Sequence, residues 1–255
     1  GVILIHASWH WVFISLLGIA LLASGLFLWQ IPETLPPEYR HPLALDRVLG
    51  NYYGLLRHRQ GMGFLLTGAC SFSGMMTFIV GSPYVYIVLY GVPTAWFGVL
   101  FGANVAAAML ANLLNTGLVT RLGAERLLRL GLRVQVVAAL ILLGLALLEA
   151  PPLWAIVLGV LLYLGMAGVV LGNAMASYMV YFVRLAGTAS AFSGAARFGF
   201  GAAVGSLVSL AHDDTARPLL LGMALSGLMA GVCYWLLCQS HPRNSGPIPA
   251  DRSPP

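Results

Sequence analysis

The sequence predicts an all-α membrane protein that crosses the bilayer several times. Of its 255 residues, 59% are hydrophobic and only 8% are charged, and the mean hydropathy is +0.87. Soluble domains are about 45–50% apolar and about 25% charged, so the composition excludes a soluble globular protein. A spanning helix needs about 20 apolar residues. The chain is therefore long enough for about seven spans, with little length left for a soluble domain.

Charges, prolines and turn signals divide the chain into seven predicted spans. Ahead of the first span, Val2–His6 is typical of the end of another helix, and the chain starts at Gly1 without a Met. We therefore expect the beginning of the protein to be missing. Pro83 lies inside the second span and should kink that helix rather than end it. The spans are Trp11–Gln30, Gly61–Leu89, Thr94–Thr120, Leu132–Leu148, Leu153–Met179, Gly187–Leu210 and Pro218–Cys238.

The longest connection, residues 31–60, carries the one amphipathic pattern of a surface helix. Its apolar residues follow helical spacing at Leu45, Val48, Leu49, Tyr52 and Leu56. This pattern favours an interfacial helix that links two halves of a larger protein, over a loop that merely buries its apolar side chains. The C-terminal segment 239–255 is rich in proline and polar residues, and we predict that it is disordered.

The arginines predict which side of the membrane each loop faces. All thirteen basic residues are arginines, Arg217 lies on one side of the predicted spans, and Arg197 lies within a span. The other eleven gather on the opposite side, which the positive-inside rule makes cytoplasmic. The C-terminus is then cytoplasmic and Gly1 lies at the outer face. The positive charge does not form a patch interleaved with aromatic residues, so a nucleic-acid partner is not expected. The eleven are Arg40, Arg47, Arg57, Arg59, Arg121, Arg126, Arg129, Arg133, Arg184, Arg243 and Arg252.

Enzyme and metal signatures are absent from the sequence. No Asp or Glu falls within a predicted span, every His lies at or beyond a span end, and neither an HExxH nor a P-loop motif occurs. We therefore predict no catalytic residue, no metal site and no enzymatic activity. The three cysteines, Cys70, Cys233 and Cys238, lie in apolar runs and are interpreted as packing residues rather than a disulfide or a metal site.

Arg197 is the leading candidate for a functional residue. It lies about 15 Å from the start of its predicted helix, which places it near the middle of the membrane. A charged side chain there is costly and marks a functional site by default. The alternative is a structural arginine that extends toward the interface or caps a neighbouring helix.

Three GxxxG pairs (Gly98–Gly102, Gly168–Gly172 and Gly201–Gly205) indicate close helix packing.

Other residues in the spans are candidates for the lining of a substrate cavity. Asn104 and Asn173 are amides at membrane depth, where cavity lining and hydrogen bonding between helices are equally good interpretations. Phe72, Met76 and Tyr84 belong to a span rich in adaptable, polarizable side chains. Such side chains suit a promiscuous apolar pocket, although core packing and lipid contact also explain them.

Several motifs together resemble the bicyclomycin-resistance (Bcr/CflA) group of drug:proton antiporters in the major facilitator superfamily. The resemblance covers essentially the whole chain except the tail, and the combination of motifs is more specific than any one of them. The motifs are Trp9-His10-Trp11-Val12-Phe13, Pro32-Glu33-Thr34-Leu35-Pro36-Pro37-Glu38, Gly81-Ser82-Pro83-Tyr84-Val85-Tyr86, Phe97-Gly98, Arg121-Leu122-Gly123-Ala124, Asn173-Ala174-Met175-Ala176, Ala186-Gly187-Thr188-Ala189-Ser190-Ala191 and Arg197-Phe198-Gly199.

The resemblance implies a major facilitator fold of twelve helices, of which this chain holds the end of helix five and helices six to twelve. Residues 1–31 would be the remnant of the N-terminal half, and 32–60 the cytoplasmic central loop with its interfacial helix. Residues 61–238 would be the C-terminal six-helix bundle, and 239–255 a cytoplasmic tail. Arg121, Gly123 and Arg126 resemble the gating loop between helices eight and nine.

The resemblance further implies a monomeric transporter in the bacterial inner membrane. It would export small amphipathic drugs, such as bicyclomycin or sulfonamides, by proton antiport with alternating access. The proton gradient would replace any cofactor. The expected partners are the lipid bilayer, the drugs, protons and the missing N-terminal half of the same transporter. A major facilitator that carries a nutrient or metabolite, and a membrane protein that transports nothing, stay open as alternatives.

Overall fold

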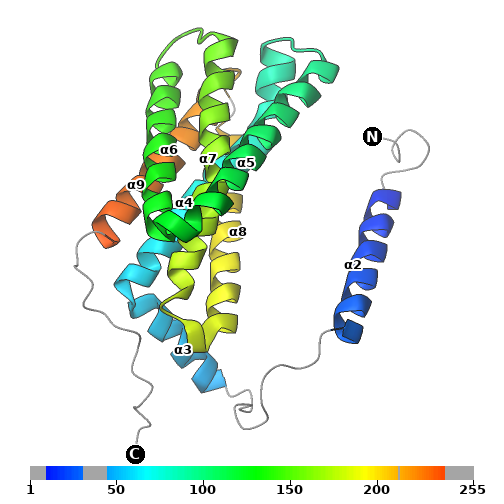
Figure 1. Ribbon diagram of the computed structural model, residues 1–255. Coiled ribbons are helices and arrows are strands. Elements are labelled where there is room, and N and C mark those ends of the chain that lie inside the picture. The colour runs from blue at the N-terminus through cyan, green and yellow to red at the C-terminus, as the bar shows by residue number, and fades with distance from the viewer. Residues whose placement is uncertain (1–9, 31–44, 212, 239–255) are drawn as a thin grey trace, which may run out of the picture. The chain divides into compact units, whose positions relative to one another are not determined.

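The computed structural model describes residues 10–30, 45–211 and 213–238, and every regular element among these residues is a helix (Figure 1). Seven of the helices are long and apolar enough to cross a membrane, which confirms the predicted fold class. The elements are α2 (His10–Gln30), α3 (Leu45–Arg57), α4 (Arg59–Pro83), the π-helix η2 (Tyr84–Leu89), α5 (Thr94–Leu122), α6 (Ala124–Ala146), α7 (Leu153–Met179), the short 3-10 helix η3 (Val183–Leu185), α8 (Ala186–Leu210) and α9 (Arg217–Leu237).

The chain divides into two compact units, residues 1–45 and 46–255. In the first unit, α2 is apolar on all sides and has no charged residue in its first or last turn. A helix with no polar face is suited to lipid rather than to the surface of a soluble domain. The first predicted span is therefore confirmed as a helix that can cross the membrane.

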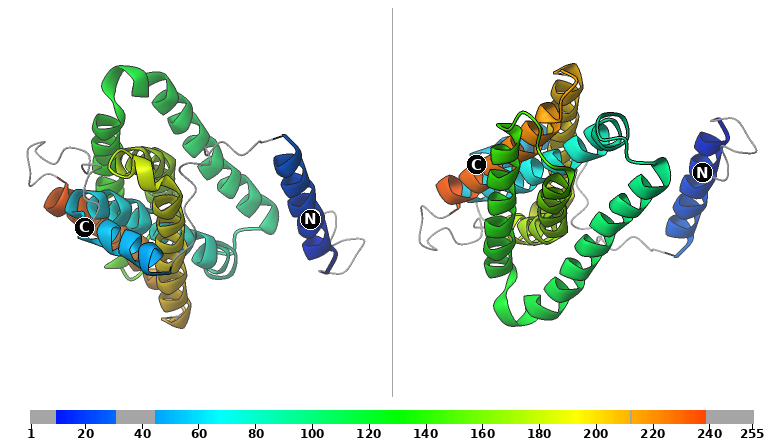
Figure 2. Two further views of the ribbon diagram at one scale, coloured as in Figure 1. Left: turned by 90° about the horizontal axis from the view of Figure 1, so that it is seen from below. Right: turned by 90° about the horizontal axis from the view of Figure 1, so that it is seen from above.

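The second unit is a bundle in which two sets of three helices pack in equivalent ways. Helix α4 packs against α8 and α9, and α7 packs in the same manner against α5 and α6. Contacts between α4 and α7 and between α6 and α9 join the two sets. Helices α5 and α8 are the least buried of the six, and Figure 2 shows one long side of α5 uncovered by other helices of the bundle.

Tyr163 of α7 anchors the core of this bundle. Its side chain is fully buried, and its hydroxyl donates to the backbone carbonyl of Ser71 on α4 at 3.4 Å. The close approach depends on Gly74, because a Cβ atom at that position would overlap the Tyr163 hydroxyl. A second apolar cluster, which includes Tyr178, Phe182 and Tyr234, fills a separate part of the bundle. Large aromatic side chains therefore hold α4, α7 and α9 together.

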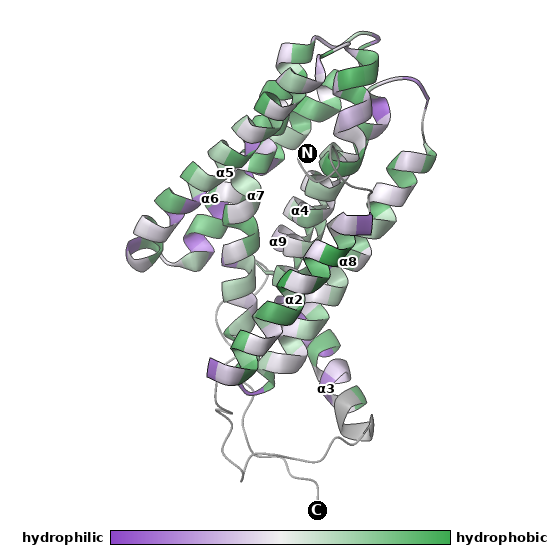
Figure 3. Ribbon diagram, turned by 90° about the vertical axis from the view of Figure 1, so that its right-hand side faces the viewer, coloured by the Kyte–Doolittle hydropathy of each residue, from purple (hydrophilic) through white to green (hydrophobic). Residues whose placement is uncertain are grey.

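The prediction for the fourth span was wrong at its start. Helix α6 begins at Ala124 rather than Leu132, so the arginine-rich segment is helical and the connection to α5 is the single residue Gly123. In this first part of α6, Leu127, Leu128 and Leu132 are buried. Arginines mark the depth at which a helix leaves the apolar layer, not the residue at which the helix begins. Figure 3 shows hydrophilic residues on α3 and where α5 meets α6.

The path of the chain continues through Pro83, as predicted, but it changes from α-helix to π-helix there. The amphipathic segment of the long connection is helical, as predicted, in α3. Its contact with the bundle uses Leu55, which is fully buried, and Tyr52, whose ring lies 5.8 Å from that of Phe192 on α8. Leu49 and Leu56, which the pattern assigned to the apolar face, are both exposed. The predicted stub 2–6 and the predicted disordered tail 239–255 lie outside the described residues.

Candidate functional site

Arg197 lies in the middle of α8 and points toward α4. It is the twelfth residue of that helix, about 16 Å from its start. Its side chain is half-buried, and the Nε and Nη2 atoms both lie 3.9 Å from the position that a Cβ atom on Gly68 would occupy. None of the described residues forms a hydrogen bond or an ion pair with this guanidinium. Gly68 thus leaves room for a charge that the bundle does not neutralise.

Phe72 and Met76 follow Gly68 along the same face of α4, and both meet α8 at Gly201. A Cβ atom on Gly201 would lie 2.8 Å from Cγ of Met76 and 3.2 Å from the ring of Phe72. We call these residues, Gly68, Phe72 and Met76 of α4 with Arg197 and Gly201 of α8, the α4–α8 seam. Three of the predicted site residues therefore lie together on one helix contact.

Asn173 forms the polar contact of a second seam, between α5 and α7. Its buried amide nitrogen donates to Oδ1 of Asn115 at 2.7 Å and to the carbonyl of Val169 at 2.8 Å. About one helical turn before Asn115 on α5, the side chain of Asn112 packs directly on the backbone of Gly168 on α7. We call these four residues, Asn112, Asn115, Gly168 and Asn173, the α5–α7 seam. Of the two interpretations of Asn173, this geometry corresponds to hydrogen bonding between helices.

Asn104, in contrast, lines a cavity of about 190 Å³ between α4, α5 and α7. The other walls are apolar and include Met75, Phe78, Phe101 and Leu164. The amide nitrogen of Asn104 donates to the Leu100 carbonyl of its own helix at 3.1 Å, while Oδ1 is buried and has no partner in the described parts of the chain. A ligand in this cavity could donate a hydrogen bond to that oxygen.

Tyr84 lies in η2, outside the α4–α8 seam. Its hydroxyl donates to Oδ1 of Asp214, in the connection between α8 and α9, at 2.9 Å. The residue lines a cavity of about 140 Å³ together with Thr215 and Pro218. Tyr84 therefore ties the end of the second span to the α8–α9 connection, which is a different place in the bundle from that of the other predicted cavity residues.

The three predicted gating residues lie around the tight connection between α5 and α6. Gly123 has a φ of +79°, a conformation that glycine adopts without steric cost. Arg121 is at the end of α5, Arg126 is in the first turns of α6, and both side chains are exposed. The predicted loop is thus a one-residue corner between two long helices.

Sequence reasoning missed Gln135 of α6, which is fully buried at the contact with α7. Its amide nitrogen lies 3.5 Å from the Tyr163 carbonyl, and its Oε1 has no partner among the described residues. A glutamine within the apolar part of a predicted span was the available signal. The arginines that precede it in sequence masked this signal, because they dominate the polar pattern of the segment.

His58 caps α4 where the connecting helix α3 ends. Its Nδ1 accepts a hydrogen bond from the backbone N–H of Gly61 at 3.0 Å. The imidazole ring packs against the rings of Tyr181 and Phe182, with centroid distances of 4.6 and 5.3 Å. Burial lowers the pKa of this histidine from its usual value near 6.5. The neutral imidazole is therefore the form that fits this site.

A model of the Major Facilitator Superfamily matches residues 1–206 of the chain. The chain belongs to this superfamily. It is 34% identical over 246 residues to the "Bicyclomycin resistance protein homolog" of Haemophilus influenzae, an alignment that covers 96% of this chain and 62% of that protein. It is also 29% identical over 233 residues to the "Uncharacterized MFS-type transporter YdgK" of Bacillus subtilis, covering 90% of this chain and 56% of that protein.

These matches confirm the resemblance to the bicyclomycin-resistance group, and the chain spans about 60% of the length of both relatives. No solved structure matches the chain. Membership of the superfamily indicates a membrane-spanning transporter rather than an enzyme. No group of three or more His, Cys, Asp or Glu side chains that could hold a metal ion occurs in the described parts of the chain.

Proposed function

We propose that the full-length protein exports small amphipathic drugs, of the bicyclomycin or sulfonamide kind, across the bacterial inner membrane by proton antiport. The observation that carries the proposal is Arg197 in the middle of α8, which pairs with none of the described residues. The name of the Haemophilus relative supports the choice of drugs over nutrients. The arginine distribution supports a cytoplasmic C-terminus.

An unpaired guanidinium at membrane depth needs a counterpart, because its charge is poorly solvated there. In the proposed mechanism the counterpart is either a carboxylate in the N-terminal half or an acceptor group of the drug. An arginine beside a carboxylate favours the ionised form and lowers the pKa of that carboxylate. A proton that binds this carboxylate would then compete with the contact between the carboxylate and Arg197. This competition would couple proton binding to drug binding.

Alternating access places this site between two halves that rock about the middle of the membrane. The proton gradient drives the cycle, so the proposal includes no cofactor, and its partners are the bilayer, the drugs, protons and the other half of a monomeric transporter. Arg121, Gly123 and Arg126 take the gating position. Gly123 is the one-residue connection between α5 and α6 at this position.

The test is drug resistance and transport by the full-length protein in cells that lack their own efflux pumps. Arg197→Ala should reduce efflux by about 10- to 150-fold, which corresponds to the loss of one charge-assisted contact of about 1.5–3 kcal/mol, or shift its pH optimum upward between pH 6 and 8. Arg197→Lys should restore efflux only in part, because an ammonium cannot reproduce the flat guanidinium fork.

Arg184→Ala is the matched control, because it removes an exposed arginine just before the same helix. It should leave efflux and its pH profile unchanged at equal protein levels. Normal efflux with an unchanged pH profile in Arg197→Ala would assign Arg197 a structural role. No effect of the intact protein on drug accumulation would favour a transporter of nutrients or metabolites instead.

A further inference from the structure

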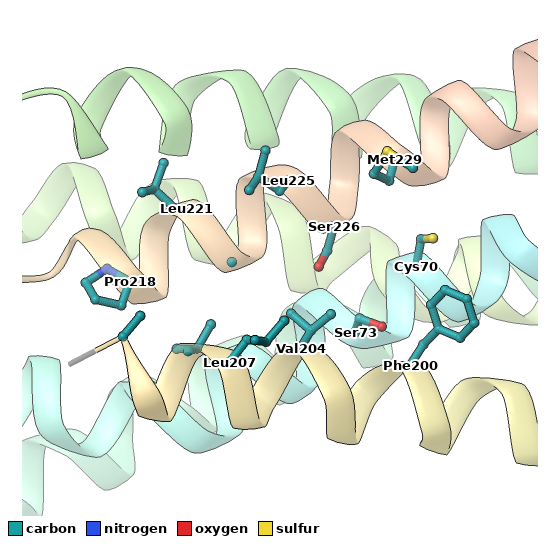
Figure 4. A pocket seen from close by; sticks show the side chains of 13 residues that line it. Cys70, Ser73, Phe200, Val204, Leu207, Pro218, Leu221, Leu225, Ser226 and Met229 are labelled. Atoms are coloured by element: carbon teal, nitrogen blue, oxygen red, sulfur yellow. The ribbon is translucent and has the colours of Figure 1, made fainter.

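A groove runs between α8 and α9, with α4 as its floor (Figure 4). Its volume is about 400 Å³. Apart from Ser73, Ser226 and the thiol of Cys70, the lining is apolar, with Val204 and Leu207 on the α8 side and Leu225 on the α9 side. The groove stays open because α8 and α9 make far fewer contacts with each other than either makes with α4.

The groove has the size and lining of a small-molecule site, since ligand pockets usually measure about 300–1,000 Å³ and are mostly apolar with a few placed polar groups. It extends from Cys70, near the middle of α4, to Ala211, directly after the last residue of α8, and Pro218, at the start of α9. Leu207 and Leu225 on its two walls are each more than half exposed, so the groove is accessible from its side.

Ser226 is the polar group that points into this groove. The residue is only 6% exposed, and Figure 4 shows its hydroxyl directed from α9 toward Ser73 and Val204. Of the described residues, none forms a hydrogen bond with it. On the floor helix α4, the hydroxyls of Thr67, Ser73 and Thr77 each donate to the carbonyl four residues earlier. Those of Ser71 and Ser82 have no partner among the described residues, but neither residue lines the groove.

The Ser226 hydroxyl faces an apolar groove without a partner among the described residues, where a polar group without a hydrogen bond is costly. A ligand with a hydrogen-bonding group would relieve that cost. The hydrocarbon part of a lipid offers no such group. Ser226 lies about 14 Å from the start of α9, so it is far from the depth at which the ester groups of a lipid lie. The Ser226 hydroxyl therefore favours a compact ligand that carries a hydrogen-bonding group over the acyl chain of a lipid.

We propose that the α8–α9 groove binds a small lipophilic molecule that carries one hydrogen-bonding group, and that Ser226 contacts this group. The site shares no lining residue with the α4–α8 seam. It would therefore bind its ligand whether or not Arg197 takes part in drug export. Binding, not transport, is the property that tests it.

The test compares two probes of nearly equal shape, 2-naphthol and 2-methylnaphthalene, on the purified full-length protein in detergent. The first carries a hydroxyl where the second carries a methyl group. Fluorescence titration should show saturable binding of both. Ser226→Ala should weaken 2-naphthol binding about fivefold, the size expected for one hydrogen bond, and should change 2-methylnaphthalene binding by less than twofold.

Leu225→Trp should abolish binding of both probes because the indole fills the groove. Leu207→Trp, from the opposite wall, replaces it if the first variant does not fold. Leu210→Trp is the matched control, since Leu210 is 83% exposed on α8 and does not line the groove, and it should bind both probes normally.

Three results would overturn the proposal. The first is an unchanged affinity for 2-naphthol in Ser226→Ala. The second is equal binding by the groove-filling variants and Leu210→Trp, which would place the probes elsewhere. The third is a phospholipid that copurifies with the wild-type protein in native mass spectrometry and is lost in Leu225→Trp, because the groove would then hold an acyl chain.

Discussion

The α4–α8 seam and the α5–α7 seam hold equivalent places in the two sets of three helices, yet they are built from opposite chemistry. In the α5–α7 seam the amide of Asn173 donates to Asn115 across the contact. In the α4–α8 seam the packing comes from Gly201 against apolar side chains, and Arg197 has no partner among the described residues. This contrast indicates that the charge is not needed to join the helices.

The first prediction disrupts the packing of the α4–α8 seam. Gly201→Leu should destabilise the protein by about 1–3 kcal/mol, because the added side chain must displace Met76 and Phe72. The measurement is thermal unfolding of the purified full-length protein, followed by intrinsic fluorescence. Gly199→Leu is the control, since a Cβ atom there meets nothing within 4 Å. Equal unfolding temperatures for the two variants would show that the close approach at Gly201 does not hold the seam.

The second prediction removes the hydrogen bond of the α5–α7 seam. Asn115→Ala, Asn173→Ala and the double variant form a cycle that isolates the energy of the pair. Hydrogen bonds between membrane helices average about 0.6 kcal/mol and reach about 1.7 kcal/mol, so we expect a coupling in this range. Thr116→Ala is a control on the same helix, because its hydroxyl bonds only within α5. Strict additivity in the cycle would contradict a stabilising contact between the two amides.

The third prediction concerns the charge of the α4–α8 seam instead of its packing. Arg197→Met keeps most of the apolar stem of the side chain and removes the guanidinium. Because no described residue pairs with that group and its charge is poorly solvated at membrane depth, the free energy of unfolding should not fall by more than about 0.5 kcal/mol. Chemical denaturation at pH 7 provides the measurement. A loss of more than about 2 kcal/mol would make Arg197 a structural residue.

The positions of the membrane helices could be predicted from the sequence because the bilayer imposes a long uninterrupted apolar run on each span. Leu153–Met179 agrees at both ends with α7, where prolines and a turn precede the helix. The start of α6 could not be predicted in the same way, because Arg126 and Arg129 interrupt the apolar run without interrupting the helix.

The contacts of the candidate site were harder to predict, because they depend on which helices are neighbours. Asn115 and Asn173 are 58 residues apart, and nothing in either local sequence shows that their side chains meet. The recurrence of Asn104, Asn112 and Asn115 along α5 shows only that polar groups repeat in this helix. Arg197 could be selected from the sequence since a charge at membrane depth is unusual anywhere in the fold. Ser226 could not, because nothing in its local sequence separates it from the other serines in the spans.

The weakest effect that we expect lies outside both seams, at His58, where stability should depend on pH. The fold lowers the pKa of this histidine, so the folded state binds the proton less readily than the unfolded state. Stability from this group should be fully present above pH 6.5 and should fall as the pH decreases toward the lowered pKa. His58→Asn, which can still cap α4, should reduce this loss when unfolding temperatures are compared between pH 7.5 and 5.5. The difference should persist in Asn173→Ala, because the Asn115–Asn173 contact shares no residue with the His58 cap. An identical pH profile for wild type and His58→Asn would exclude His58 as its source.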